Sequence, residues 1–179
     1  MKPHRRGHRL FFALVPDPAT RAAIQSVQRQ IAGGSGQAVP ADRLHATLLF
    51  LGNQSEADLA RVRESADRVA FTPCAVTLDR CGYFPRPAVA WLGSRQVPPV
   101  LDTFLLRLAA ALRSADISFD QKPWKLHVTL YRNLRIPPET IDIEPVVWSL
   151  NEFCLLESVQ SKAGLQYRHR GHWPARNQP

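Results

Sequence analysis

The sequence has 179 residues, of which 45% are hydrophobic and 21% are charged, and its formal net charge is +8. This length and composition are typical of one globular domain or two fused lobes, and they exclude intrinsic disorder and a collagen-like repeat. No uncharged run approaches the ~18 residues that a membrane-spanning helix needs, and the apolar stretch after the basic N-terminus is too short for a secretion signal.

The first half of the chain alternates apolar runs with helical patterns. Asp17 followed by Pro18 is typical of a helix N-cap and the first helical residue, and Ser55 with Asp58 resembles a capping box. We therefore expect a strand over residues 9–15, a helix from Asp17 to the glycine-rich break at residues 33–36, a strand over residues 44–51 that ends at Gly52 and Asn53, a helix that begins at Ser55, and two strands over residues 74–82 and 88–93.

The second half contains the clearest helical pattern. Strands that alternate with helices predict an α/β or α+β domain with a mixed sheet. The expected elements are a helix over residues 100–113, with Leu101, Phe104, Leu105, Leu108 and Leu112 on its buried face, and strands over residues 125–131, 146–157 and 165–172.

The excess positive charge is concentrated at both ends of the chain. Residues 1–9 contain four Lys or Arg residues and no acid, and residues 160–179 contain four more and no acid. Such ends attract phosphate-rich partners or are simply solvated tails. We expect a basic, flexible arm at residues 1–8, a single domain at residues 9–173 and a tail at residues 174–179.

The three cysteines, Cys74, Cys81 and Cys154, are an odd number and have no CxxC spacing. This pattern supports neither a disulfide framework nor a zinc site. We expect a cytoplasmic protein, because reduced cysteines are typical of that compartment.

One six-residue pattern occurs twice, 82 residues apart. Residues 43–48 read RLHATL and residues 125–130 read KLHVTL, so the residue types agree at all six positions. Each copy lies on a predicted strand, one over residues 44–51 and the other over residues 125–131. A match of this length on the same element of each half indicates two related lobes.

The spacing of the pattern places a histidine and a threonine on one strand face. Side chains two residues apart project from the same face, so His45 lies beside Thr47 and His127 lies beside Thr129. The residues between and after them point to the core. If the two strands face each other across a cleft, the site contains two imidazoles and two hydroxyls.

That set of groups suits phosphoryl chemistry. A neutral imidazole accepts a proton from an attacking hydroxyl or water, and a protonated imidazole gives one to the leaving oxygen. The threonine hydroxyls donate hydrogen bonds to the phosphate oxygens, where charge gathers, so no metal is required. A single histidine on a half-buried strand is more often structural. The pairing of two motifs favours catalysis.

At these residues the sequence resembles the two-histidine phosphoesterase superfamily, which is defined by two H-x-T/S-hydrophobic motifs. Its RNA 2′,3′-cyclic phosphodiesterase branch, also called 2′-5′ RNA ligase-like, is the most similar. The resemblance implies an α+β, bilobal fold with a pseudo-twofold axis, in which antiparallel sheets line a central cleft and helices lie outside. It covers nearly the whole chain and is carried by residues 9–14, 44–52, 127–132 and 153–158.

The resemblance also implies hydrolysis of RNA 2′,3′-cyclic phosphate ends to 2′-phosphates, with no metal or cofactor. By the family pattern, His45 is the proton donor to the leaving 3′-oxygen, and His127 is the proton acceptor that activates water. Thr47 and Thr129 hold the phosphate. The implied partners are RNA ends or cyclic nucleotides, without a membrane, and we expect a monomer.

Three further residues are candidates for substrate binding. Phe50 and Arg132 each follow their motif histidine by five residues and match family positions proposed for base stacking and phosphate contact. Because five is an odd offset, both side chains point away from the histidine face unless the strand ends or bulges first. The alternatives are core packing of Phe50 and a surface ion pair of Arg132. Tyr167 is a candidate for base stacking or for core packing.

The sequence departs from the family pattern in two places. Leu126 precedes the second histidine, where many members have proline, and Trp124 comes two residues earlier. The C-terminal strand is unusually basic. Its His169 and His172 are three residues apart, which does not place them on one strand face, so we interpret them as part of a basic patch and not as a metal site.

Two other functions remain open from the sequence. The same site acts as a 2′-5′ RNA ligase or transesterase if an RNA 5′-hydroxyl replaces water. The basic ends alternatively serve a non-catalytic RNA-binding module. The chain has no P-loop, GxSxG elbow or Rossmann fingerprint, so the nucleotide-triphosphate, serine-hydrolase and dehydrogenase classes are excluded.

Overall fold

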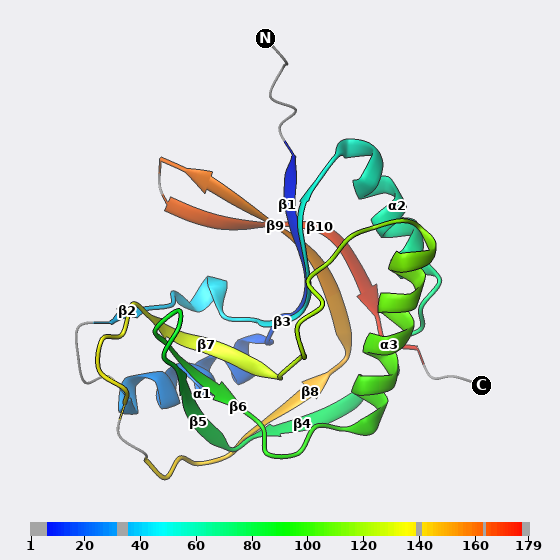
Figure 1. The fold of residues 1–179 in the computed structure, drawn as a ribbon. Coiled ribbons are helices and arrows are strands. Elements are labelled where there is room, and N and C mark those ends of the chain that lie inside the picture. Colours follow the sequence, from blue (N-terminus) through cyan, green and yellow to red (C-terminus); the bar gives the residue numbers. More distant parts are fainter. Residues whose placement is uncertain (1–6, 32–35, 139–140, 163, 177–179) are drawn as a thin grey trace.

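The computed structural model describes residues 7–31, 36–138, 141–162 and 164–176 (Figure 1). These residues form an α+β fold. Its helices are α1 (Pro18–Gln30), α2 (Glu56–Asp67), α3 (Pro99–Ser114) and the 3₁₀-helix η1 (Ala41–Arg43). Its strands are β1 (His8–Leu14), β2 (Gln37–Ala38), β3 (Ala46–Gln54), β4 (Cys74–Leu78), β5 (Arg80–Phe84), β6 (Val89–Gly93), β7 (His127–Arg132), β8 (Val146–Leu150), β9 (Glu152–Ser161) and β10 (Gly164–Pro174).

One antiparallel sheet runs through both lobes. Its order is β10-β9-β1-β3-β7-β6-β5, with β2 paired to β7 beside this path, while β4 and β8 form a separate two-stranded sheet. Every strand pair in the described part of the chain is antiparallel. The antiparallel sheets that the resemblance implies are therefore confirmed. The mixed sheet expected from alternation is wrong, because the helices connect strands that run antiparallel or lie in different sheets.

The two lobes meet at a single paired position. We call β10, β9, β1 and β3 the first lobe and β7, β6, β5 and β2 the second. The ladder between β3 and β7 consists of one pair, Ala46 opposite Val128, and these are equivalent positions of the two motifs. When equivalent residues of antiparallel strands stand opposite each other, a local twofold axis passes between them. The motif strands are therefore related by a pseudo-twofold axis.

Each motif strand has a bulge directly after its threonine. Leu48 has no partner in the ladder between β3 and β1, and Leu130 has none in the ladder between β7 and β6. The two positions are 82 residues apart, so the bulges are equivalent. A bulge inserts one residue and reverses the face on which the following side chains lie. The side chain five residues after each histidine therefore returns to the histidine face.

A buried glutamine supports the bulge in β7. Gln28 of α1 is 7% exposed, and its amide donates to the carbonyl oxygens of Leu130 at 2.8 Å and Val39 at 3.0 Å. The Tyr131 hydroxyl donates to the backbone carbonyl oxygen of Gln28 at 3.1 Å. A bulge leaves backbone groups outside the ladder. The Leu130 carbonyl also accepts from the amide of Val39 at 2.8 Å, so Gln28 is its second donor. Gln28 thus holds the backbone that directs Arg132.

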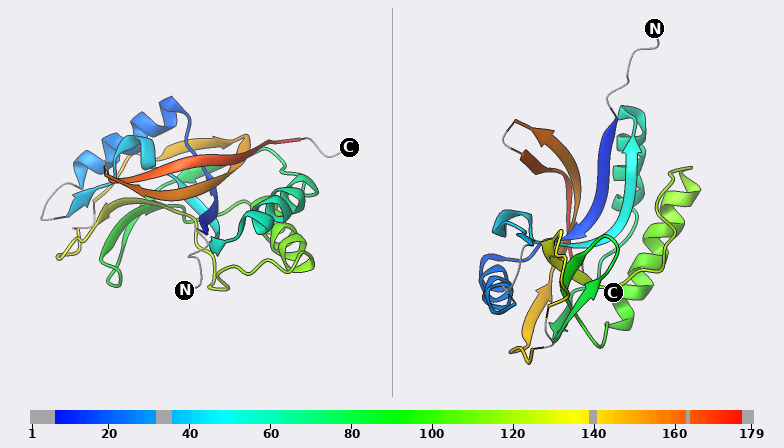
Figure 2. Two further views of the ribbon diagram at one scale, coloured as in Figure 1. Left: turned by 90° about the horizontal axis from the view of Figure 1, so that it is seen from above. Right: turned by 60° about the vertical axis from the view of Figure 1, so that its left-hand side comes forward.

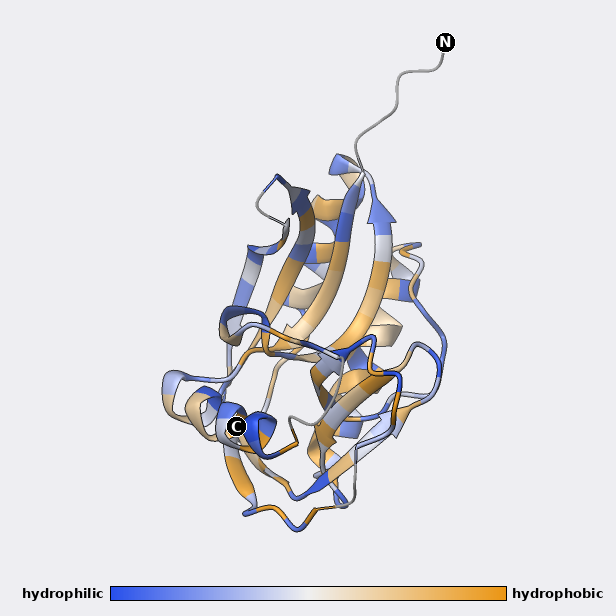
Figure 3. Ribbon diagram, turned by 90° about the vertical axis from the view of Figure 1, so that its left-hand side faces the viewer, coloured by the Kyte–Doolittle hydropathy of each residue, from blue (hydrophilic) through white to orange (hydrophobic). Residues whose placement is uncertain are grey.

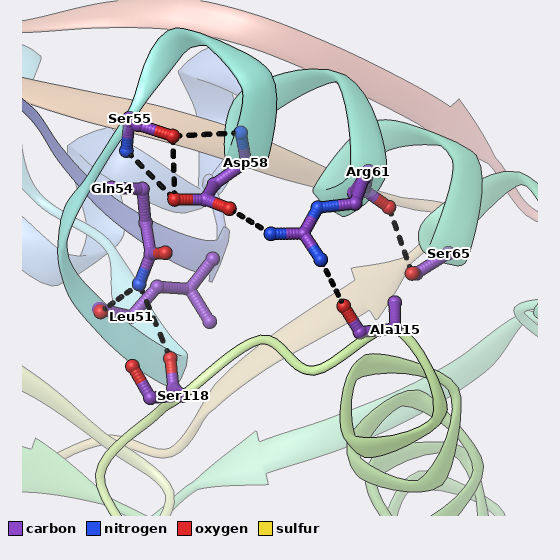
Figure 4. A network of polar contacts seen from close by, with 8 residues as sticks. All are labelled: Leu51, Gln54, Ser55, Asp58, Arg61, Ser65, Ala115 and Ser118. Atoms are coloured by element: carbon purple, nitrogen blue, oxygen red, sulfur yellow. Dashed lines mark hydrogen bonds and ion pairs between the residues drawn. The ribbon is translucent and has the colours of Figure 1, made fainter.

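A polar network connects the end of β3 to the start of α2 (Figure 4). The buried side chain of Gln54 donates to the carbonyl oxygens of Leu51 at 2.5 Å and Ser118 at 3.2 Å. The hydroxyl of Ser55 accepts from the amide of Asp58 at 3.1 Å, and the Asp58 carboxylate accepts from the amide of Ser55 at 3.1 Å. The predicted capping box is confirmed.

The helices cover different parts of the sheet. Asp17 caps α1 by accepting from the amides of Ala19 and Thr20, as predicted. Figures 1 and 2 show α2 and α3 side by side, whereas α1 lies beside β8. Arg61 of α2 donates to the carbonyl oxygen of Ala115 at 2.9 Å and so links α2 to the end of α3.

One apolar core joins the two lobes. It includes the whole predicted face of α3, and it continues along the buried sides of β1, β3, β7 and β8. Figure 3 shows the apolar residues along the strands of the main sheet. The rings of Phe71, Phe104 and Phe153 meet at centroid distances of 4.8 to 5.7 Å. This shared core holds the lobes in one arrangement.

The structure corrects several predicted boundaries. The motif strands begin at Ala46 and His127, two residues later than expected. The first strand also continues past Gly52, which adopts a φ of +69° that glycine tolerates and still pairs with Leu10 of β1. The single strands expected over residues 74–82 and 146–157 are each two strands. They divide at Asp79 and Asn151, where the chain passes between the small sheet and the main sheet.

The first and last strands extend one residue beyond the expected domain of residues 9–173 at each end. β1 begins at His8, the last residue of the expected arm, and residues 1–6 lie outside the described part. At the other end, the amides of Ala175 and Arg176 donate to the carbonyl oxygens of Asn151 at 2.6 Å and Phe71 at 2.8 Å. The expected tail therefore begins with anchored residues, and residues 177–179 are not described. Most of the glycine-rich break, residues 33–35, is also outside the described part.

Cys74, Cys81 and Cys154 are free thiols. Among the described residues, no helix has the length and apolar character needed to span a bilayer.

Replacing Gln28 by leucine tests the role of the buried amide. The leucine removes a donor from the carbonyls of Leu130 and Val39, so we expect the free energy of unfolding to fall by about 1–3 kcal/mol. Urea unfolding followed by circular dichroism measures the change. Gln30→Leu, the same substitution at an exposed position of α1, is the control, with an expected change within about 0.5 kcal/mol. Equal losses in the two variants would show that the amide does not support the bulge.

Candidate active site

His45 and His127 occupy equivalent positions at the starts of the motif strands. His45 directly precedes β3, and His127 is the first residue of β7. The Nδ1–H of His45 donates to the carbonyl oxygen of Arg43 at 2.8 Å, and that of His127 donates to the carbonyl oxygen of Lys125 at 2.7 Å. Because a carbonyl only accepts, Nδ1 carries the proton in each neutral ring. Nε2 is therefore the nitrogen available for proton transfer in both.

The pseudo-twofold axis brings the two motifs into one site. Extending the β3–β7 register by one residue on each side places His45 opposite Thr129 and His127 opposite Thr47. Directly opposite residues share a sheet face, with Cβ atoms about 4.5–5.5 Å apart. The Nε2 of His45 also lies 3.1 Å from Oγ1 of Thr47. Two imidazoles and two hydroxyls thus gather on one face at the lobe junction.

The His45 ring lies in an aromatic, cationic environment. Its centroid is 5.1 Å from that of Phe11 and 5.1 Å from that of Tyr167. Burial, followed by the positive charges of Arg132 and His127, lowers the pKa of His45 to about 4. His45 is therefore neutral at pH 7 in the ligand-free protein.

The His127 ring stands against a different wall. It is edge-on to Phe84 at a centroid distance of 5.3 Å and to Trp91 at 6.5 Å. Burial, together with the positive charges of Lys125 and Arg132, lowers the pKa of His127 below its ordinary value. Both imidazoles can therefore accept a proton, and an anion placed between them would favour the protonated form of either.

Two hollows border the His45 ring. The large hollow has a volume of about 490 Å³, within the range of sites for nucleotide-sized ligands. The small hollow has a volume of about 90 Å³, too little for a nucleoside. The large hollow is lined by Arg9, Phe11, His45, Thr47, Phe50 and Tyr167 among others, and the small one by Arg43, His45, Thr129, Arg132, Leu165 and Tyr167.

The structure places six of the seven predicted site residues around these hollows. The bulges turn Phe50 and Arg132 toward His45, in spite of their odd offset. Phe50 lines the large hollow with the guanidinium of Arg9 4.9 Å from its ring centroid, and it also packs on the small cluster around Phe11. Arg132 lines both hollows. Among the described residues it has no ion-pair partner, which argues against the surface ion pair.

The two remaining predicted residues differ, because Tyr167 lines the hollows and His127 does not. Tyr167 both lines the hollows and packs against Phe11, so the two alternatives for it are compatible. His127 lines neither hollow and stands on the wall formed by Phe84 and Trp91. The two walls of the junction are therefore different, although the motifs are related by symmetry.

Sequence reasoning missed some residues that build the site. Arg43 and Lys125 open the two motifs, and the repeat itself was the signal that marks them. Trp124 donates its indole N–H to the carbonyl oxygen of Thr47 at 2.9 Å and ties the segment before β7 to β3. The sequence signal for Trp124 was the departure from the family pattern at Leu126, where many members have proline. Arg9 shows no sequence signal beyond its charge.

The basic residues of β10, Arg168, His169, Arg170 and His172, line neither hollow. His172 pairs with the carboxylate of Glu152 on β9. In the part of the chain that the structure describes, no group of three or more His, Cys, Asp or Glu side chains is arranged to hold a metal ion. The chemistry available at the junction is proton transfer by imidazoles and binding of an anion by hydroxyl and guanidinium donors.

Comparisons with known proteins find phosphoesterases. The profile of a family described as "LigT like Phosphoesterase" matches residues 14–91. An RNA 2′,3′-cyclic phosphodiesterase of Archaeoglobus fulgidus is 34% identical over 142 residues, which cover 75% of this chain and 78% of that protein. An RNA 2′,3′-cyclic phosphodiesterase of Escherichia coli is 31% identical over 176 residues, which cover 92% of this chain and 95% of that protein.

A solved structure agrees with the fold as a whole. The crystal structure of E. coli LigT complexed with 3′-AMP matches this chain with a TM-score of 0.84 at 28% identity, over 96% of this chain and 99% of that one. The bilobal α+β fold that the resemblance implies is confirmed at this level.

Titration of the histidines by NMR tests the environments described above. We expect a midpoint near pH 4 for His45 and below 6.5 for His127, because burial disfavours the charged ring. His8 is the internal control, since its contacts with Glu157 and Glu56 raise its pKa above 6.5. Single His→Ala variants assign the signals. A midpoint for His45 at or above 6.5 would mean that the ring is hydrated and that the packing described here is wrong.

Proposed function

This chain belongs to the LigT-like phosphoesterase family, and from that premise we propose that it hydrolyses the 2′,3′-cyclic phosphate ends of RNA to 2′-phosphates. The activity named for its relatives supports the proposal. The observation that carries it is the pair of imidazoles at the lobe junction, each with Nδ1–H held by a carbonyl and Nε2 left for proton transfer.

The position of the large hollow supports the assignment of the proton donor. The hollow has the size of a nucleoside and is lined by His45 and Phe50, whereas His127 lines neither hollow and packs against Phe84. The leaving 3′-oxygen belongs to the ribose, and the attacking water approaches phosphorus from the opposite side. His45 is therefore assigned as the proton donor to the 3′-oxygen, and His127 as the acceptor of the water proton.

The reaction then proceeds in one balanced displacement. Nε2 of His127 takes a proton from water while the water oxygen bonds to phosphorus. The bond between phosphorus and the 3′-oxygen breaks, Nε2–H of His45 gives its proton to that oxygen, and the phosphate remains on the 2′-oxygen. Thr47 and Thr129 donate hydrogen bonds to the non-bridging oxygens, and Arg132 balances their charge.

The substrate supplies the negative charge that the free site lacks. Burial and nearby cations disfavour the protonated imidazole in the ligand-free protein. A phosphodiester anion beside His45 adds the opposite charge, which raises the pKa of His45 and makes it a proton donor in the complex. Burial and the positive charge of Lys125 lower the pKa of His127 and oppose this effect of the anion at that ring, which favours the neutral form that a base needs.

Alanine substitution of either histidine tests the acid–base assignment. We expect His45→Ala and His127→Ala each to lower kcat for adenosine 2′,3′-cyclic phosphate by about 10²- to 10⁴-fold, since each removes one proton-transfer group. Chromatographic product assays measure the rate, and circular dichroism checks the fold. His169→Ala, a histidine of β10 that lines neither hollow, is the control and should retain the parental rate. Turnover within tenfold of the parent in either motif variant would contradict the assignment.

The identity of the product and the response to a chelator test the reaction class. With EDTA present, we expect unchanged turnover and a phosphate on the 2′-oxygen only, because imidazoles and hydroxyl donors carry out every step. Phosphate on the 3′-oxygen would reverse the assigned leaving group, and loss of turnover in EDTA would contradict metal independence.

The same preparation separates the two alternative functions. Incubation with tRNA half-molecules would yield a joined 2′-5′ product if the protein acts as a ligase, in which an RNA 5′-hydroxyl replaces water. A non-catalytic RNA-binding module would bind RNA with a steep salt dependence that His45→Ala leaves unchanged. The proposed hydrolase instead predicts turnover of the cyclic end without joining.

A further inference from the structure

The small hollow has in its wall one charged residue, Arg43, that has no role in the hydrolysis described above. It lies beside the reactive groups, because His45, Thr129 and Arg132 form part of its wall. It also shares Leu165 and Tyr167 with the large hollow. Its volume of about 90 Å³ is less than a fifth of that of the large hollow, so it suits a compact group and not a second nucleoside.

The small hollow is also strongly cationic. Arg43, at the end of η1, is half-buried in its wall and faces the same space as Arg132. Among the described residues, neither guanidinium is paired with a carboxylate. Two arginines that share a small, partly enclosed space without an acid repel each other and favour an anion. The planar guanidinium matches the oxygens of a phosphate in particular.

The chemistry of an RNA end provides one further anion at this place. The ribose of the terminal nucleoside carries three groups, namely the base, the cyclic phosphate and the 5′-oxygen with its phosphate. In the proposed complex the large hollow holds the nucleoside, and the two histidines contact the cyclic phosphate. The small hollow borders the site of the nucleoside and that of the cyclic phosphate. It therefore lies beside the ribose, from which the 5′-oxygen extends.

We propose that the small hollow binds the phosphate on the 5′ side of the terminal nucleoside, with Arg43 as its main ligand. This inference rests on the proposed function and names the substrate class of that site. The preferred substrate is then an RNA chain end, or a cyclic nucleotide with a 5′-phosphate, in preference to a cyclic mononucleotide with a free 5′-hydroxyl.

The cations beside Trp91 do not take the place of Arg43. Lys125 and Arg80 lie over the ring of Trp91 at 4.5 and 5.2 Å from its centroid. That ring contacts His127, and neither cation lines the small or the large hollow. Arg80 therefore provides an arginine control that lies outside both hollows.

Comparing adenosine 2′,3′-cyclic phosphate with its 5′-phosphorylated form isolates the effect of the 5′-phosphate. We expect kcat/KM to be about threefold to tenfold higher for the phosphorylated form, a modest factor because the hollow is open to solvent. The ratio of the two kcat/KM values is the readout, since a change in the acidity of either histidine affects both substrates alike. The preference should decrease as salt is added.

Substitution of Arg43 then decides the inference. In Arg43→Gln we expect the ratio to fall to about one, and in Arg43→Lys, which keeps a point charge, to lie between one and the parental value. Arg80→Gln should leave the ratio unchanged. A parental ratio of one or less, a ratio that Arg43→Gln does not alter, or a ratio that only Arg80→Gln removes would each overturn the inference.

A binding measurement separates this inference from the proposed hydrolysis. Calorimetry with adenosine 2′-phosphate and adenosine 2′,5′-bisphosphate requires no turnover. We expect the bisphosphate to bind about threefold to tenfold more tightly to the parent and equally well to Arg43→Gln. If neither cyclic substrate is turned over and this difference is still found, the hydrolase proposal fails and the 5′-phosphate site stands. If turnover is found without any difference, the 5′-phosphate site fails alone.

Discussion

The architecture of the site depends on one antiparallel contact, the pairing of Ala46 with Val128. Because these residues are equivalent positions of the repeated motif, their pairing places a local twofold axis between the lobes. Each histidine then lies opposite the threonine of the other motif. A shift of this register by one residue would turn one histidine–threonine pair into the core, and no phosphate could contact both motifs. The apolar core that continues through both lobes maintains this register.

The equivalent bulges after Thr47 and Thr129 extend the motif beyond what a regular strand permits. Each brings one more side chain to the reactive face, Phe50 from the first lobe and Arg132 from the second. The same backbone feature therefore places an aromatic ring in the site from the first lobe and a cation from the second. Buried Gln28 donates to the backbone of the second bulge, in addition to the amide of Val39. The strands share one geometry, and the side chains placed on it give the two lobes different roles.

His45 and His127 occupy equivalent positions of the motif but have different surroundings. Both rings are held by a backbone carbonyl two residues earlier and are kept neutral by burial and by cations. His45 borders the hollows, whereas His127 faces Phe84 and Trp91. Arg43, Arg132 and Lys125 surround the junction and have no acidic partner among the described residues, so the ligand-free site favours an anion. An arriving phosphodiester therefore brings the charge that permits proton donation.

The sequence by itself determined the two motifs, the strand face shared by each histidine and threonine, the capping of α1 and α2, and the buried face of α3, because these depend on local spacing and local hydrogen bonds. It did not determine where Phe50 and Arg132 point, because an odd offset is resolved only by bulges that the neighbouring strands impose. It also did not reveal that the chain changes sheets at Asp79 and Asn151. The hollows, the separate wall of His127 and the place of Arg43 were decided by tertiary structure alone, since they arise where segments distant in sequence pack together.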